Sequence, residues 1–78
     1  MFKLTVAKID EVLFQGKVDA VNCPGSEGEL TIMTDHLPLI TSLKKGGLKI
    51  TIKEGEEKKI EIEKGLLEVG RKETIILV

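Results

Sequence analysis

Residues 48–64 read LKITIKEGEEKKIEIEK, and their alternation of aliphatic and polar side chains decides the fold. The apolar side chains of 48–53 fall on one side of a strand, and those of 59–64 do the same. Period-two alternation is typical of a strand with one buried and one solvated face. The break between them, EGEEK at 54–58, contains a glycine, so we predict an antiparallel hairpin with a longer turn.

The same pattern recurs along the chain. FKLTVAK at 2–8 alternates, and the segments at 66–69 and 73–78 read as a further strand pair. KVDAVNC at 17–23 reads as one strand with a bulge, preceded by a turn at Gly16. No window of ten or more residues has a capped helical pattern, so we predict an all-β protein, a small sandwich or flattened barrel.

The chain has 78 residues, which predicts a single domain over 1–78. Hydrophobic residues make up 41% of it, an ordinary globular balance. Phe2 and Phe14 are its only aromatic residues. We therefore expect a core built almost entirely from aliphatic side chains.

The formal net charge is −1, so no overall field draws this chain to nucleic acid. Residues 1–39 hold three lysines and six acids, whereas 40–78 hold nine basic and seven acidic residues. The single cysteine cannot form an internal disulfide, which indicates a reducing compartment. The first residues do not form a signal peptide and no run is long enough to span a bilayer, so we expect a soluble, untargeted protein without direct membrane insertion.

The stretch at 23–41, CPGSEGELTIMTDHLPLIT, carries the residues that could do chemistry. Cys23, His36 and an acid such as Asp35 or Glu29 could form a thiol-based catalytic set, since a nucleophile needs a base within reach. A chain this small offers little room for a substrate pocket, and a small cysteine before a proline packs well as an apolar residue. One histidine and one cysteine are too few for a structural zinc site, so we expect no catalytic residue, metal or cofactor.

Loop chemistry and surface contact explain the stretch better. PGSEGE at 24–29 reads as a glycine-containing turn with two exposed acids, which is either a plain solvated turn or a contact for a basic partner loop. HLPLIT at 36–41 places three apolar residues around a proline, and they cannot all face inward from one strand. Exposed apolar area of this kind indicates an interaction patch.

In combination these segments closely resemble the epsilon subunit of the rotary F-type ATP synthase. The resemblance covers essentially the whole chain and rests on GKV at 16–18, PGSEGE at 24–29, HLPLIT at 36–41, LKKG at 43–46 and GLLEV at 65–69. It departs from the family pattern at Asp35, because the family usually has proline or glycine just before the histidine.

The resemblance implies a ten-stranded β-sandwich of two five-stranded sheets, normally followed by a C-terminal helical hairpin, and the 78 residues stop where that hairpin would begin. It also implies a non-catalytic rotor subunit of the central stalk, which couples the gamma subunit to the membrane c-ring during ATP synthesis. The implied location is the cytoplasmic side of the bacterial plasma membrane, attached through the complex. The alternatives left open are a free-standing β-sandwich interaction module and a small thiol enzyme.

Two contact sets carry over from the family position by position. The residues expected to meet the c-ring are Ser26, Glu27, Gly28 and Glu29. Those expected to face the gamma subunit are Lys8, His36, Leu37, Pro38, Leu39 and Thr41.

Overall fold

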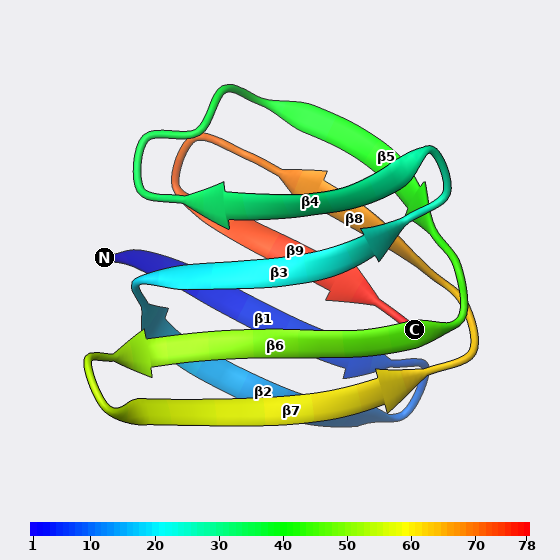
Figure 1. The fold of residues 1–78 in the computed structure, drawn as a ribbon, viewed down its shortest axis with the longest axis horizontal. Helices are drawn as coiled ribbons and strands as arrows, with labels where there is room; N and C mark the ends of the chain where they lie inside the picture. The colour runs from blue at the N-terminus through cyan, green and yellow to red at the C-terminus, as the bar shows by residue number, and fades with distance from the viewer.

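The computed structural model describes all of residues 1–78 and contains nine β-strands (Figure 1). In chain order they are β1 (Phe2–Lys8), β2 (Glu11–Val18), β3 (Ala20–Gly25), β4 (Gly28–Met33), β5 (Leu39–Leu43), β6 (Gly46–Lys53), β7 (Glu56–Ile62), β8 (Gly65–Val69) and β9 (Glu73–Leu77). The all-β prediction is confirmed. The structure has no helix long and apolar enough to cross a membrane.

The strands form two layers that face each other. One layer has the order β2-β1-β9-β8-β5, and the other has the order β4-β3-β6-β7. Every pairing is antiparallel except that of β1 with β9, which is parallel. The predicted sandwich is therefore present (Figure 1).

The two layers are joined at one corner, where the chain passes from β5 into β6. Gly25 at the end of β3 pairs with Leu43 in β5, while residues earlier in β3 pair with β6. At the same corner, the Lys44 N–H, in the link from β5 to β6, donates to the Pro24 carbonyl of β3 over 2.9 Å. A chain that changes sheets at a bend is a common way to make the corner of a sandwich.

The expected count of ten strands in two five-stranded sheets is wrong. The sheets have five and four strands, because the 39–43 segment pairs with β8 in one layer and only touches β3 in the other. Residues 34–38, which connect β4 to β5, form a turn followed by three residues without strand pairing. Pro38 in that stretch has no N–H to give to a ladder.

Two further local predictions are also wrong. Residues 17–23 do not form one strand, because the chain bends at Asp19, between β2 and β3. Gly16 lies inside β2, opposite Leu4, and not in a turn. The predicted hairpin at 48–64 is confirmed as β6 and β7, but its turn is tighter than expected: Lys53 pairs with Glu56, and Gly55 takes a positive φ of 81°.

The core between the layers is aliphatic, as expected. Both phenylalanines are only partly buried and pack against its margin. The Lys58 ammonium lies 5.8 Å from the centre of the Phe14 ring. Phe14 is in β2 and Lys58 is in β7, and these are edge strands of the two sheets. The thirteen buried core residues are Leu4, Val6, Val18, Val21, Cys23, Ile32, Leu43, Leu48, Ile50, Ile62, Leu67, Val69 and Ile76.

Gly25 sits at the crowded corner where β3, β4 and β5 meet. A Cβ atom there would lie 2.5 Å from the Gly28 carbonyl oxygen and 2.5 Å from Cδ2 of Leu30. Because the nearest oxygen belongs to the backbone, the hairpin itself would have to shift. We expect Gly25→Ala to lower the free energy of unfolding by about 1–3 kcal/mol, measured by urea denaturation.

Gly16→Ala is the matched control for this prediction. A Cβ atom at Gly16 would meet only the Phe14 ring, at 3.7 Å, which is an ordinary contact. Alanine also restricts the unfolded chain more than glycine does, so this variant should be neutral or stabilised by up to about 1 kcal/mol. Equal losses in the two variants would contradict the close approach at Gly25.

Candidate interaction surfaces

The acidic tip, residues 26–29, comprises the turn between β3 and β4 and the first two residues of β4. Strand pairing continues to Gly25 and Gly28, so only Ser26 and Glu27 form the turn. Gly28 has a φ of 136°, a conformation that side chains rarely adopt. All four residues of the tip are exposed. Glu27 and Glu29 form no ion pair with the chain's own lysines, so their charges remain available to a partner.

The segment at 36–41 begins after a tight turn and runs into β5. The His36 N–H donates to the Met33 carbonyl over 3.2 Å, and Asp35 inside that turn has a φ of 67°. A positive φ favours glycine, and aspartate tolerates it better than most residues. This explains how Asp35 can replace a glycine here, but it does not fit a proline, whose ring fixes φ at about −65°. Leu37, just beyond, is 78% exposed.

The expected gamma-facing residues do not form one cluster. Leu39 aligns across β8 and β9 with Leu4 in β1, through the pairs with Val69 and Thr74. Along β1, Lys8 lies four residues beyond Leu4, which is a distance of about 13 Å. Across the sheet, β1 and β5 are separated by three strand spacings, or about 14 Å. Lys8 is therefore at the opposite end of the five-stranded sheet from His36, and nearer the acidic tip.

Next to Lys8, the outer face of the five-stranded sheet carries an apolar row that sequence reasoning missed. Val12 pairs with Ala7, Ala7 with Leu77, and Leu77 with Leu66, so their side chains lie side by side on four adjacent strands. Val12, Leu77 and Leu66 are 58%, 50% and 43% exposed. Ile40 of β5, on the same sheet, is 67% exposed.

The sequence did contain a signal for this row. The adjacent apolar residues Leu66 and Leu67, and the run of Ile75, Ile76 and Leu77, interrupt strict alternation. A strand with apolar residues at consecutive positions is apolar on both faces, which indicates that both are covered. The inner face is covered by the other sheet, but nothing in this chain covers the outer face.

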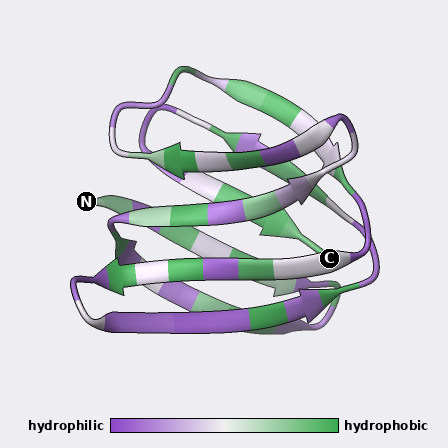
Figure 2. Cartoon of the chain, viewed as in Figure 1, coloured by the Kyte–Doolittle hydropathy of each residue, from purple (hydrophilic) through white to green (hydrophobic).

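The outer face of the other sheet is polar. It carries an ion pair of 3.5 Å between Lys49 and Glu57, and a hydrogen bond of 2.8 Å from the Asn22 amide to the Thr31 hydroxyl. Figure 2 shows that β7 is hydrophilic for most of its length, whereas green segments alternate with purple and white ones along β6. The two outer faces thus differ in chemistry, and the five-stranded one is the better surface for an apolar partner.

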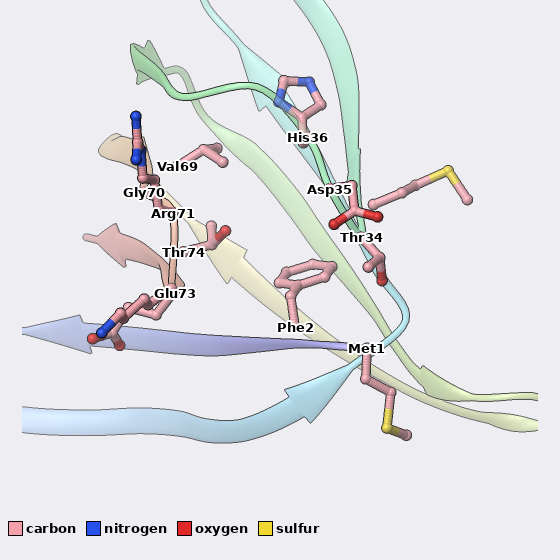
Figure 3. A pocket seen from close by; sticks show the side chains of 12 residues that line it. Met1, Phe2, Thr34, Asp35, His36, Val69, Gly70, Arg71, Glu73 and Thr74 are labelled. Atoms are coloured by element: carbon pink, nitrogen blue, oxygen red, sulfur yellow. The ribbon is translucent and has the colours of Figure 1, made fainter.

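A pocket of about 150 Å³ lies at the His36 end of the sandwich. In Figure 3 the Phe2 ring lies between the turn at Thr34 and Asp35 and the β8–β9 turn. The residues that line the pocket include the acidic Asp35 and Glu73 and the basic Arg71. The His36 Nδ1 atom is 2.7 Å from the Leu37 carbonyl oxygen, an interaction within its own loop. Cys23 does not line this pocket, so the pocket does not assemble the thiol-based set that was considered and rejected from the sequence.

Cys23 is fully buried in the core, away from that histidine. Burial raises the pKa of its thiol from 9.0 to about 12. A thiol, unlike a thiolate, is a poor nucleophile. No group of three or more His, Cys, Asp or Glu side chains is placed to hold a metal ion.

The raised pKa of Cys23 predicts a loss of stability in alkali. The unfolded thiol loses its proton near pH 9, whereas the buried thiol keeps its proton until about pH 12. Between these values the unfolded state binds fewer protons, so the free energy of unfolding falls as pH rises, by at most about 1.4 kcal/mol per pH unit. Denaturation at pH 8 to 11 measures this fall.

Cys23→Val is the control, because it keeps an apolar side chain of similar size without a titrating group. Lysines titrate in both proteins, so the difference between the two curves isolates the thiol. The native protein should also resist a thiol reagent at pH 8 that labels the unfolded chain. Rapid labelling of native Cys23, or identical curves for the two proteins, would refute its burial as a neutral thiol.

The fold and these surfaces define a small β-sandwich domain whose most distinctive features are an acidic tip and one apolar outer face. The profile of the family described as ATP synthase, Delta/Epsilon chain, beta-sandwich domain matches residues 1–78. The chain belongs to this family.

Individual relatives agree with this assignment. The ATP synthase epsilon chain of Dichelobacter nodosus is 40% identical over 76 residues, which cover 97% of this chain and 53% of the relative. The chain thus spans about half the length of this curated relative. A chain in the structure of Euglena gracilis mitochondrial ATP synthase (OSCP, F1 and c-ring) has a TM-score of 0.91 at 24% identity, covering 99% of this chain and 49% of that one. A chain from the central stalk and c-ring of Tetrahymena thermophila ATP synthase has a TM-score of 0.84 at 16% identity, covering 99% and 62%. These two likenesses bear on the fold.

Proposed function

We propose that residues 1–78 act as one unit, the sandwich domain of an epsilon-type subunit in an F-type ATP synthase. In this proposal the domain is a non-catalytic part of the rotor and couples the gamma subunit to the c-ring during ATP synthesis. The observation that carries the proposal is the match of the family profile to the whole of 1–78. The names of the relatives, an epsilon chain and a central stalk with its c-ring, support it.

The proposed place of work is the cytoplasmic side of a bacterial plasma membrane, where the domain is held peripherally by the complex. The bacterial relative at 40% identity supports a bacterial setting. The domain needs no cofactor in this role, since it works by being a rigid block with two contact surfaces.

The first contact is the acidic tip, which we assign to the c-ring. Ser26, Glu27, Gly28 and Glu29 stand at one extremity of the sandwich, exposed and free of internal ion pairs. Uncompensated acids are suited to basic or polar loops of a partner, because opposite charges steer the encounter and fix its register.

The second contact is the outer face of the five-stranded sheet, which we assign to the gamma subunit. Two of the residues predicted for this contact, Leu39 and Thr41, lie on the inward-facing side of β5, where Leu39 packs against the core, so they do not belong to the outer face. Lys8 and His36 lie at opposite ends of the sheet. The apolar row of Val12, Ala7, Leu77 and Leu66 crosses the same face. A partner that covers this face would reach both ends and bury the exposed leucines.

The complex itself tests the proposal. The tagged chain, added to membranes of its source organism, should recover the gamma subunit and the c-ring after mild detergent extraction. Circular dichroism would confirm that the tagged chain is folded. If a folded chain reproducibly failed to recover these subunits, the proposal would be overturned and a free-standing interaction module would be favoured.

Glu29→Lys tests the ring contact. Replacing an acid by a base at the tip should reduce retention on the c-ring by about tenfold, because it turns an attraction into a repulsion. Glu54→Lys is the control, since it makes the same charge change in the β6–β7 turn, away from the acidic tip. Retention is measured by co-sedimentation with membranes. Equal retention of Glu29→Lys and the unchanged chain would remove Glu29 from the contact.

Leu77→Lys tests the gamma contact. A charge in the middle of the apolar row should weaken capture of the gamma subunit by about tenfold or more, as expected for a buried apolar contact. Met33→Lys is the matched control: Met33 is 60% exposed and lies on the other sheet. Quantitative pull-down with purified gamma subunit provides the measurement. If Met33→Lys weakened capture and Leu77→Lys did not, the assignment of faces would be reversed.

A further inference from the structure

The acidic tip is attached to β5 as well as to its own hairpin. The Ser26 N–H donates to the Ser42 carbonyl over 3.0 Å, and the two serine hydroxyls share a second hydrogen bond of 2.9 Å. Sixteen positions separate these serines in the chain. Two residues before Ser26, the Pro24 carbonyl accepts the N–H of Lys44 over 2.9 Å. Three hydrogen bonds therefore join the hairpin to the corner between the sheets.

These bonds act where the hairpin would otherwise be least constrained. β4 pairs only with β3, so the tip has no second strand beside it on that side. Directly below, Gly25 pairs with both Gly28 and Leu43 and has no room for a side chain. The base of the tip is thus fixed by packing, and the first turn residue is fixed by Ser42. Glu27 and Glu29 have no internal ion pair to orient them.

Ser42 also connects the tip to the opposite contact. It lies in β5, one residue beyond Thr41, the last of the predicted gamma-facing residues, and it pairs with Leu66 of the apolar row. Ala7, Leu77, Leu66 and Ser42 are thus successive cross-strand partners on four adjacent strands. The last of them, Ser42, is the residue bonded to the tip.

We propose that Ser42 is a positioning residue for the ring contact: its hydrogen bonds to Ser26 hold the acidic tip in one orientation relative to the gamma-facing sheet. This inference rests on the proposed function. A contact that is held ready loses less freedom on binding, so ordering the tip in advance raises affinity without adding a contact. It also makes the two surfaces parts of one rigid body, which a coupling role requires.

Ser42→Ala removes one of the two Ser26–Ser42 bonds and leaves the backbone bond. Amide hydrogen exchange of Ser26, Glu27 and Gly28, measured by NMR on the 78-residue chain, should accelerate about twofold to tenfold. Retention on membranes stripped of their own epsilon subunit should fall by a similar factor. Ser42→Thr, which keeps the hydroxyl, should restore both values.

Thr31→Ala is the matched control. It removes a hydrogen bond of the same kind, from Asn22 at 2.8 Å, on the same hairpin, but this bond does not reach β5. The control should leave exchange at the tip and retention unchanged. If Ser42→Ala behaves like Thr31→Ala in both measurements, the positioning role is overturned.

The two readouts separate this inference from the proposed function. If the unchanged chain is not retained by the stripped membranes, the proposed function fails, and a positioning role for ring binding fails with it. If the unchanged chain is retained and Ser42→Ala is retained equally while its tip exchanges faster, the bond orders the tip without serving the ring contact, and the inference alone fails. Parallel loss of order and retention, rescued by Ser42→Thr, supports it.

Discussion

The two sheets have only each other to cover their aliphatic inner faces, and the rest of the structure depends on this burial. Thirteen buried residues form one cluster without an aromatic ring among them. Each buried methylene contributes about 0.8 kcal/mol, so many small side chains replace a few large ones. Interiors of this kind are close-packed, and a change of backbone position in one sheet is felt in the other.

The corner between β5 and β6 turns this packing into a single rigid body. The same short stretch of chain supplies a strand to one sheet, begins a strand of the other, and holds the hairpin between them through Pro24 and Ser26. Glycine at position 25 is needed because three strands meet there. The proposed coupling role needs this property: force applied to one surface must reach the other without deforming the block between them.

Most strand positions could be predicted from the sequence, since alternation in segments such as 2–8 and 48–53 is a local property. The errors have nonlocal causes. Nothing within residues 17–23 shows that the chain bends at Asp19. The bend is needed because the residues before it pair with β1 in one sheet, whereas the residues after it pair with β4 in the other. For the site, the tip and some exposed apolar area within residues 36–41 were predicted from loop chemistry and the family pattern, but the row of Leu66 and Leu77 was not.

The sequence by itself determined the all-β class, the aliphatic core, the charged tip and the family, because these depend on residue type and on spacing along the chain. Only the tertiary structure decided which residues share a surface. It put Lys8 and His36 at opposite ends of one sheet, assembled an apolar row from four separate strands, and brought Ser42 to Ser26. These arrangements depend on strand order and register, which are set by the packing of the whole chain and not by any segment of it.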